Sequence, residues 1–371
     1  MATPFSSKLF VKTIPLLMLG FVIVINASDP PLTLDYYKSS CPRLLSIVRK
    51  EMECAVFSDP RNAAIIVRLH MHDCFVQVVL LDDTFTLKGE KKAAQNKHSL
   101  RGFRLMDRLK LLVESGCPGV VSCADILTIA ARDAVLLVGG PYWDVPLGRK
   151  DARTANFELA NTNLPGANEG LVSIIAKFLA QGLSVTDMVA LSVFMSNQPL
   201  IGQLGCEPSS HLFVFLPTSH SAYEPTGAHT IGKARCENFR ARVYGDMELT
   251  SDKSLMSEVY MSNLRSICPA TGGNNNVTNL DYVTPNLFDN SYYQLLLRGQ
   301  GLLNSDQEMY SSLLGVETRH LVEKYAHDPV EFFNQFAESM VKMGNITNYE
   351  SFVSGEIRKN CRFINSLTHS E

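Results

Sequence analysis

The segment from Arg68 to Cys74 holds the densest group of side chains that could do chemistry, and it reads Arg-Leu-His-Met-His-Asp-Cys. Arg68 and His72 are four residues apart, so on a helix both side chains point from one face. An imidazole there could move a proton while the permanent cation stabilises developing negative charge. A buried pair satisfied by backbone carbonyls is the alternative. Zinc or copper held by His70, His72 and Cys74 is a weaker interpretation, because residues two apart do not converge on a helix.

A second candidate is His229, in the segment Gly-Ala-His-Thr-Ile-Gly from Gly227 to Gly232. Small neighbours would let a flat ligand approach the imidazole closely. Taken alone, the segment favours a satisfied core histidine over a ligand. Asp306 is a lone acid in Leu-Asn-Ser-Asp-Gln and indicates no function by itself.

Oxygen-bearing side chains cluster between Asp281 and Asp289, with Thr284 between them. Two carboxylates, a hydroxyl and loop carbonyls can form an oxygen cage for a hard cation such as calcium. Turns and helix caps use the same residue types, so that alternative stays open.

Helical periodicity dominates the elements that must position these residues. Apolar residues recur at helical spacing over Leu171–Gln181, before Gly182, and over Ser122–Leu137 and Val330–Met343. The run from Asn62 to Val67 predicts a helix buried on most sides. Strand-like alternation is scarce, so the sequence predicts a mainly α protein.

The composition is that of a globular protein, with 371 residues, 46% hydrophobic and 19% charged. This length suffices for one large domain or two smaller lobes. The formal net charge is −3 and no basic block occurs. We therefore expect no nucleic-acid partner, because phosphate binding needs clustered lysine and arginine.

The N-terminus predicts secretion. Lys8 and Lys12 precede an apolar run from Ile14 to Ile25, which ends in small and polar residues. This layout indicates a signal peptide over residues 1–28, followed by one domain over 29–371; an uncleaved anchor is the alternative. No later segment is apolar enough to span a membrane, so we expect no membrane association after cleavage. Nine cysteines suit an oxidising compartment.

The stretch from Val193 to Thr226 differs from the rest of the chain. It contains four prolines, no lysine or arginine, a lone Cys206 and the apolar patch Leu212 to Leu216. Neither helical periodicity nor the polarity of a solvated linker is present. A structureless segment of this length is unusual inside a compact domain.

Together these motifs resemble the class III plant peroxidases, which are secreted haem enzymes. The match runs from the Leu32–Pro42 segment to Gly355–Arg362. The most specific motifs are Leu69–Val76, Val121–Leu127, Pro146–Arg149, the His229 segment and Ser339–Asn345. The resemblance implies a two-lobed fold with haem b between a distal and a proximal lobe. It also implies that the reducing substrates are small phenols. They are oxidised one electron at a time while hydrogen peroxide is reduced to water.

Residue by residue, the resemblance implies the following roles. His229 is the axial ligand of the haem iron, and Asp306 accepts the other ring N–H of that histidine. His72 takes a proton from hydrogen peroxide and returns it to the leaving oxygen, while Arg68 stabilises the separating charge. Asn96 holds His72 in the basic tautomer. Pro165 lines the entrance for phenols.

The resemblance also implies calcium, disulfides and a location. The family has two calcium ions; here the proximal set is Thr230, Asp281, Thr284, Leu287 and Asp289, and the distal remainder is Asp73, Val76 and Glu90. Asp125 and Arg149 match a buried ion pair, and the implied bridges are Cys41–Cys117, Cys123–Cys361 and Cys236–Cys268. We expect a monomer that is extracellular, in the cell wall or in the vacuole.

Two departures from the family bear on activity. After Gln77 the chain is about four residues short, and the lost run holds the partner of Cys74 and most distal calcium ligands. Calcium takes six to eight oxygen ligands, so we expect the distal site to be weak or empty and the protein to hold one calcium ion rather than two. The less favoured alternative is that Asp82 or Asp83 replaces the missing ligands. The second departure is the insertion at 193–226, which looks like altered exon joining. A milder change is Met71, where the family has an aromatic residue.

Two function hypotheses follow. The first is a working peroxidase, supported by the presence of Arg68, His72, Asn96, His229 and Asp306. The second is a secreted peroxidase-shaped protein with impaired or no catalysis, acting as a binding or wall-associated scaffold, which the two departures favour. A non-haem metalloenzyme is a minor third reading.

Overall fold

The computed structural model describes residues 32–76, 78–85, 87–192, 230–245, 258–346 and 354–365. Within these residues helices dominate, and the two strands β1 (Lys233–Arg235) and β2 (Val277–Asn279) form one short antiparallel pair. The prediction of a mainly α protein is confirmed.

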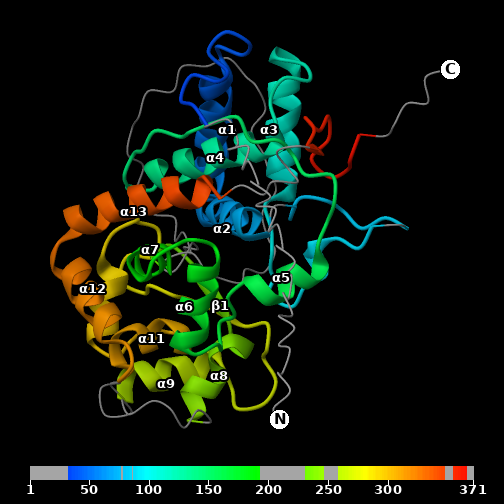
Figure 1. Cartoon of the computed structure of the whole chain (residues 1–371). Coiled ribbons are helices and arrows are strands. Elements are labelled where there is room, and N and C mark those ends of the chain that lie inside the picture. The colour runs from blue at the N-terminus through cyan, green and yellow to red at the C-terminus, as the bar shows by residue number, and fades with distance from the viewer. Residues whose placement is uncertain are drawn as a thin grey trace, which may run out of the picture. The chain divides into compact units, whose positions relative to one another are not determined.

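The first group of helices surrounds the segment that carries Arg68 and His72. It comprises α1 (Leu44–Ser58), α2 (Arg61–Val76), α3 (Phe103–Gly116) and α4 (Cys123–Leu137), with the short 3-10 turn η1 (Glu90–Lys92). Helices α1, α2 and α3 all contact α4, and α2 makes the most extensive contact with it (Figure 1).

The remaining helices form the rest of the body. They are α5 (Phe157–Asn163), α6 (Leu171–Ala180), α7 (Val185–Leu191), α8 (Cys236–Tyr244), α9 (Glu258–Ile267), α10 (Ser291–Leu297), α11 (Asn304–Ser311), α12 (Val316–His327) and α13 (Pro329–Gly344). Helices α7, α10 and α13 share the main core with α1 to α4, whereas α8 and α9 pack around a smaller core of their own beside β1.

Helix α2 is buried on nearly all sides, as its sequence predicts. Every residue from Ile66 to Val76 is buried, including the charged and polar side chains of Arg68, His72 and Asp73. A helix that is apolar all round belongs inside the protein, so its few polar groups must find partners there.

The three helices expected from periodicity are all present. Leu171–Gln181 corresponds to α6, Ser122–Leu137 to α4 and Val330–Met343 to α13. Their boundaries follow local chemistry. The Ser122 side chain caps α4 by accepting from the Asp125 N–H, and Asp328 caps α13 just before Pro329.

Three of the predicted features lie outside the described residues: the signal peptide at 1–28, the insertion at 193–226, and His229. Among the described residues no single helix is long and apolar enough to cross a membrane. Only α6 and α7 together reach that length and composition, and they are bent by 108° at their junction.

Disulfides tie distant parts of the chain together. Cys41 joins Cys117, Cys123 joins Cys361, and Cys236 joins Cys268, which is the pairing that the resemblance implies. The first bridge joins the segment before α1 to the end of α3, and the second joins the start of α4 to the C-terminal segment.

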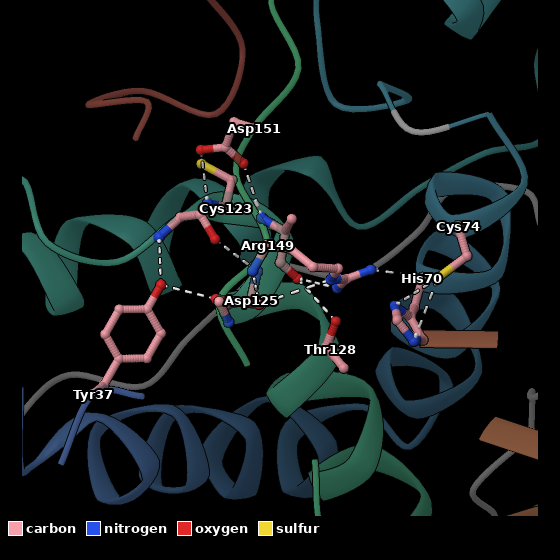
Figure 2. Close-up of polar contacts among 11 residues, drawn as sticks. Tyr37, His70, Cys74, Cys123, Asp125, Thr128, Arg149 and Asp151 are labelled. Atoms are coloured by element: carbon pink, nitrogen blue, oxygen red, sulfur yellow. Dashed lines mark hydrogen bonds and ion pairs between the residues drawn. The ribbon is translucent and has the colours of Figure 1, made fainter. Parts of the chain in front are cut away.

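Asp151 strengthens the same junction without a covalent bond. This carboxylate is buried and accepts from the backbone N–H groups of Cys123 and Ala124, each at 3.0 Å. It also accepts from the Arg358 N–H at 2.9 Å. A carboxylate at the N-terminus of α4 is favourable because that helix end carries partial positive charge (Figure 2).

Asp151→Ala is expected to destabilise the protein by about 3 kcal/mol, since three buried N–H groups lose a charged acceptor. Chemical denaturation followed by fluorescence measures this loss. Asp144→Ala, at an exposed carboxylate, is the control and should change stability by less than about 0.5 kcal/mol. Equal stability of the two variants would contradict this role for Asp151.

Candidate active site

His72 and Asn96 form the first contact of the site. The His72 Nδ1 lies 2.6 Å from the Asn96 Oδ1, and the Asn96 Nδ2 donates to the Glu90 carbonyl at 2.8 Å. This second bond fixes the orientation of the amide, so its oxygen faces the imidazole. Because that oxygen can only accept, Nδ1 carries the proton and Nε2 keeps its lone pair.

Arg68 lies one helical turn away on the same face of α2. Its Nε is 3.3 Å from the His72 Nε2. The rest of the guanidinium donates to the carbonyls of Gln95 and Ser99, at 3.0 and 3.2 Å, and to the Ser99 hydroxyl at 3.0 Å. The segment that holds Asn96 therefore also fixes Arg68. The predicted pairing of Arg68 with His72 on one helical face is confirmed.

Burial and charge set the protonation of this pair. Burial lowers the pKa of His72 well below its usual range, and the Arg68 cation lowers it further, whereas the hydrogen bond to Asn96 opposes both. Burial also lowers the pKa of Arg68, to about 9, with help from Arg101 and Arg235. At neutral pH the imidazole is therefore neutral and the guanidinium is charged, which are the states that a base and a charge stabiliser need.

Arg101 and Arg235 extend this positive charge. Both act electrostatically on Arg68, although Arg101 lies in the loop before α3 and Arg235 ends β1. The Nε of each is buried and has no hydrogen-bond partner among the described residues. Arg235 pairs with Glu237 at 2.6 Å, which leaves the cluster with an excess of positive charge. Such a cluster favours an anionic ligand.

The acid that the resemblance places behind the iron ligand is Asp306. It is 2% exposed at the start of α11, and its Oδ2 accepts from the Leu303 N–H at 3.3 Å. His229 lies outside the described residues, so its contact with Asp306 is not described. Pro165 lies in the partly buried loop after α5, where Lys177 donates to the neighbouring Leu164 carbonyl at 2.8 Å.

The structure brings the proposed proximal calcium ligands together. The Thr284 hydroxyl lies 3.2 Å from the Asp281 Oδ2 and 3.0 Å from the Asp289 Oδ1. The Thr230 hydroxyl donates to the Asp289 carbonyl at 2.9 Å. Leu287 donates its N–H to the Thr284 carbonyl at 3.0 Å, which closes the loop. Oxygen atoms of four residues, from Thr230 and from the 281–289 loop, thus converge.

The remaining ligands of the distal calcium site, Asp73, Val76 and Glu90, are arranged differently. Backbone donors reach both carboxylates, because the Val79 N–H donates to Asp73 and the Asn156 N–H donates to the Glu90 Oε1. The Glu90 Oε2 is buried without a hydrogen-bond partner among the described residues. Burial raises the pKa of Asp73 to about 6 and that of Glu90 to about 8, against the opposing charge of Arg358. Val76 ends α2 and is buried.

Asp82 and Asp83 do not fill the gap left by the shortened loop. Asp82 pairs with Lys91 and with Arg362, and Asp83 pairs with Lys92. Within the part of the chain that the structure describes, no three His, Cys, Asp or Glu side chains lie close enough to hold a metal ion.

The opposite face of α2 carries a separate polar cluster (Figure 2). Cys74 is a buried free thiol whose Sγ lies 3.7 Å from the His70 Nδ1 and 3.6 Å from an Arg149 nitrogen. Arg149 also pairs with Asp125 at 3.7 Å, and Asp125 accepts from the Tyr37 hydroxyl at 2.8 Å. His70 and Cys74 therefore point away from His72, which argues against a metal site shared by all three.

Comparisons with known proteins agree with this geometry. A sequence profile described as Peroxidase matches residues 48–328. Peroxidase 11 of Arabidopsis thaliana is 60% identical over 344 residues, covering 91% of this chain and 92% of that protein. Peroxidase N of Armoracia rusticana is 44% identical over 345 residues, covering 92% and 93%. The chain belongs to the peroxidase family.

As a class III haem peroxidase, the protein has the two-lobed fold of that family and uses hydrogen peroxide to oxidise donor substrates. The described residues fit a haem, because the Nε atoms of Arg101 and Arg235 are buried without a hydrogen-bond partner among the described residues, and haem carries two propionates that such donors can bind. Bound haem supplies the redox chemistry of the reaction.

The side chains of this peroxidase divide the proton and charge work. The unprotonated Nε2 of His72 is the atom that can accept a proton from hydrogen peroxide, and the same atom can return it to the departing oxygen. Arg68 presents a fixed positive charge beside that atom. Asn96 keeps the proton of His72 on Nδ1, so that Nε2 stays unprotonated.

Sequence reasoning missed Arg101 and Arg235. The signal available to it was weak, namely an arginine shortly after Asn96 and another shortly after His229. Arg101 and Arg235 come close to Arg68 only in the folded chain, and their spacing in the sequence does not reveal this.

His72→Ala is expected to slow the reaction with hydrogen peroxide by about 100- to 10,000-fold, because it removes the positioned base. Stopped-flow mixing with hydrogen peroxide measures the rate, and the Soret band checks that haem is still bound. Arg68→Lys should also slow the reaction, since an ammonium group cannot reproduce the planar guanidinium.

The control is His70→Gln, which alters a neighbouring histidine on the opposite face of α2. This variant should keep a rate close to that of the unaltered protein. A rate unchanged in His72→Ala, or lost equally in His70→Gln, would overturn the assignment of His72.

Proposed function

We propose that this chain is a secreted, catalytically active haem b peroxidase in which His72 and Arg68 carry the peroxide step. The observation that supports this most strongly is the fixed relay from Glu90 through Asn96 to His72, with Arg68 at 3.3 Å. An inactive scaffold has no use for a neutral imidazole held in one tautomer beside a buried cation. His229 would then hold the haem iron, and Asp306 would orient it.

Donor oxidation is proposed to occur at the haem edge, with Pro165 lining the entrance for small phenols. The polypeptide would be processed after residue 28 and would act as a monomer in the cell wall or the vacuole. The net charge of −3 gives no support to nucleic-acid binding.

The direct test of activity is the purified full chain. A Soret absorption band together with hydrogen-peroxide-dependent oxidation of 2-methoxyphenol supports a working enzyme. A Soret band without turnover would instead favour the scaffold hypothesis, and the absence of both would reject the proposed function.

Calcium content distinguishes the two proposed metal sites. Metal analysis of dialysed protein is expected to give one calcium ion per haem, held by the set that includes Thr230, Asp281 and Asp289. Asp289→Asn should release this ion because it removes a charged ligand, whereas Glu90→Gln should leave the content unchanged. Two tightly held ions per haem would contradict this proposal.

The insertion at 193–226 is proposed to hinder production of the loaded enzyme. Loop closure tolerates added length, at about 0.6 kcal/mol for each doubling. The apolar patch Leu212 to Leu216 is less readily tolerated, because exposed apolar segments promote aggregation. Deleting 193–226 should therefore raise the yield of haem-loaded protein, measured as Soret absorbance per polypeptide. Equal occupancy and specific activity with and without the segment would show it to be harmless.

A further inference from the structure

The short turn η1 carries the carbonyl that orients Asn96. The Glu90 carbonyl accepts from the Asn96 Nδ2 at 2.8 Å, and Asn96 in turn keeps the proton of His72 on Nδ1. Because the peptide bond is planar, this carbonyl is rigidly joined to the backbone nitrogen of Lys91. Three residues of 3-10 helix have little stability of their own. Contacts from other parts of the chain must therefore hold η1 in place.

One side of η1 is attached to α5 and to the segment before it. The Asn156 N–H donates to the Glu90 Oε1 at 2.9 Å, and the Ala94 N–H donates to the Asn161 Oδ1 at 2.9 Å. Under the proposed function the distal calcium site is weak or empty, and the inference drawn below rests on that proposal. No tightly held cation then fixes the turn.

The side chain of Lys91 attaches the other side of η1 to a group of charges, the Lys91 cluster, which consists of Asp82, Lys91, Asp107 and Arg362. Lys91 pairs with Asp82, whose Oδ2 lies 3.4 Å from the Arg362 Nη1. Arg362 binds Asp107 through two nitrogens, with its Nε 2.9 Å from Oδ1 and its Nη2 2.6 Å from Oδ2. The Asp82 N–H also donates to the Arg362 carbonyl at 2.9 Å. Charges of opposite sign thus alternate along the cluster.

The ring of Phe103, at the start of α3, contacts both cations of the Lys91 cluster. The Lys91 Nζ lies 3.8 Å from the ring centroid, and the Arg362 guanidinium carbon lies 5.4 Å from it. Both distances are within the range of a cation–π interaction. The disulfide Cys123–Cys361 anchors the residue next to Arg362. The cluster therefore attaches η1 to α3 and to a covalently anchored part of the C-terminal segment.

Water reaches the Lys91 cluster, and this determines how the cluster responds to salt. The side chains of Lys91, Arg362 and Asp82 are 17%, 23% and 34% exposed. An isolated surface ion pair contributes little to stability, but bidentate geometry and a network of pairs are the exceptions. Salt screens charges that water reaches, and the Debye length falls to ~3 Å at about 1 M salt. High salt should therefore weaken this attachment of η1.

We propose that Lys91 is a positioning residue for the peroxide step, acting on His72 through the Glu90 carbonyl and Asn96. With the rest of the Lys91 cluster, it holds η1 by ion pairing in place of a tightly bound distal calcium ion. Lys91 touches neither peroxide nor haem, and its effect reaches His72 only through the backbone of η1. The rate of the peroxide reaction is consequently sensitive to salt, unlike that of a site fixed by a tightly held metal ion.

The first test is Lys91→Met, which keeps an unbranched side chain beside Phe103 but removes its charge. The rate constant for the reaction with hydrogen peroxide should fall about tenfold, because a misplaced base loses much of its effect. Stopped flow measures this rate. Lys91→Arg restores a cation that can pair with Asp82, and it should recover most of the lost rate.

Lys92→Gln is the matched control. Lys92 lies in the same turn and pairs with Asp83 at 2.5 Å, but its side chain is 70% exposed. In this variant Asp83 keeps its hydrogen bond from the Gly89 N–H at 2.7 Å. The control should therefore react with hydrogen peroxide at the rate of the unaltered protein. An equal loss of rate in Lys92→Gln would overturn the specific role of Lys91.

Salt provides a second test, which requires no variant to fold. Hydrogen peroxide is uncharged, so electrostatic steering does not affect its encounter with the protein. Raising sodium chloride from about 0.05 to about 1 M should slow the unaltered holoenzyme and Lys92→Gln towards the rate of Lys91→Met. Lys91→Met itself should hardly respond, because its ion pairing is already lost. A rate independent of salt in the unaltered holoenzyme would overturn the proposal.

Electron paramagnetic resonance of the resting ferric enzyme adds a readout that does not depend on turnover. When η1 loosens, the unprotonated Nε2 of His72 can move toward the iron and ligate it, which converts high-spin haem into low-spin haem. The low-spin fraction should rise in Lys91→Met and at high salt, and it should stay at the unaltered level in Lys92→Gln. A general loss of stability would lower the haem content instead.

The outcomes separate this inference from the proposed function. Absence of a Soret band and of donor oxidation in the unaltered protein would reject the peroxidase activity itself. A working enzyme in which Lys91→Met is as fast and as fully high-spin as the unaltered protein would overturn the role of Lys91 alone.

Discussion

The hydrogen bond between the His72 Nδ1 and the Asn96 Oδ1 is the interaction on which the account of the active site depends. It determines which ring nitrogen is free, and so which atom can take a proton from peroxide. Its geometry is set in turn by the Glu90 carbonyl and by the Gln95–Ser99 segment, which also holds Arg68. One short stretch of backbone therefore fixes both members of the pair, and a change there would alter base and cation together.

Helix α2 explains why the chain can depart from its family and still keep this arrangement. Arg68 and His72 share one face, whereas His70 and Cys74 share another. There Arg149 contacts Cys74, and Asp125 pairs with Arg149. The shortened loop after residue 76 adjoins the second face. The backbone N–H of Val79, in that loop, donates to Asp73, so this buried carboxylate has a hydrogen-bond partner in the described structure.

Local chemistry made part of the molecule predictable from sequence. Helix α6 follows from apolar spacing and from Gly182, and the Arg68–His72 pairing follows from a separation of four residues. Other features depend on tertiary contacts that have no local signal. Asp151 caps α4 from a segment well beyond that helix, and Arg101 comes within electrostatic range of Arg235, at the end of β1, only in the folded chain.

The aromatic contacts of the main core illustrate the same limit. Helical periodicity over Val330–Met343 indicates that Phe332 and Phe336 face inward, but their contacts with Tyr293 and Trp143 arise from how α10, α13 and the segment after α4 pack. Sequence periodicity identifies which side chains face inward. It does not identify which of them meet.

The measurement that tests the central claim most directly is the pH dependence of the reaction with hydrogen peroxide, followed by stopped flow. Burial and the Arg68 cation hold the pKa of His72 well below the ordinary histidine value of 6.5. Lowering the pH should therefore leave the rate constant unchanged through 6.5, and the rate should fall only when the pH drops through the depressed pKa and His72 gains a proton. A rate that halves near pH 6.5, as an ordinary histidine would give, would contradict the account.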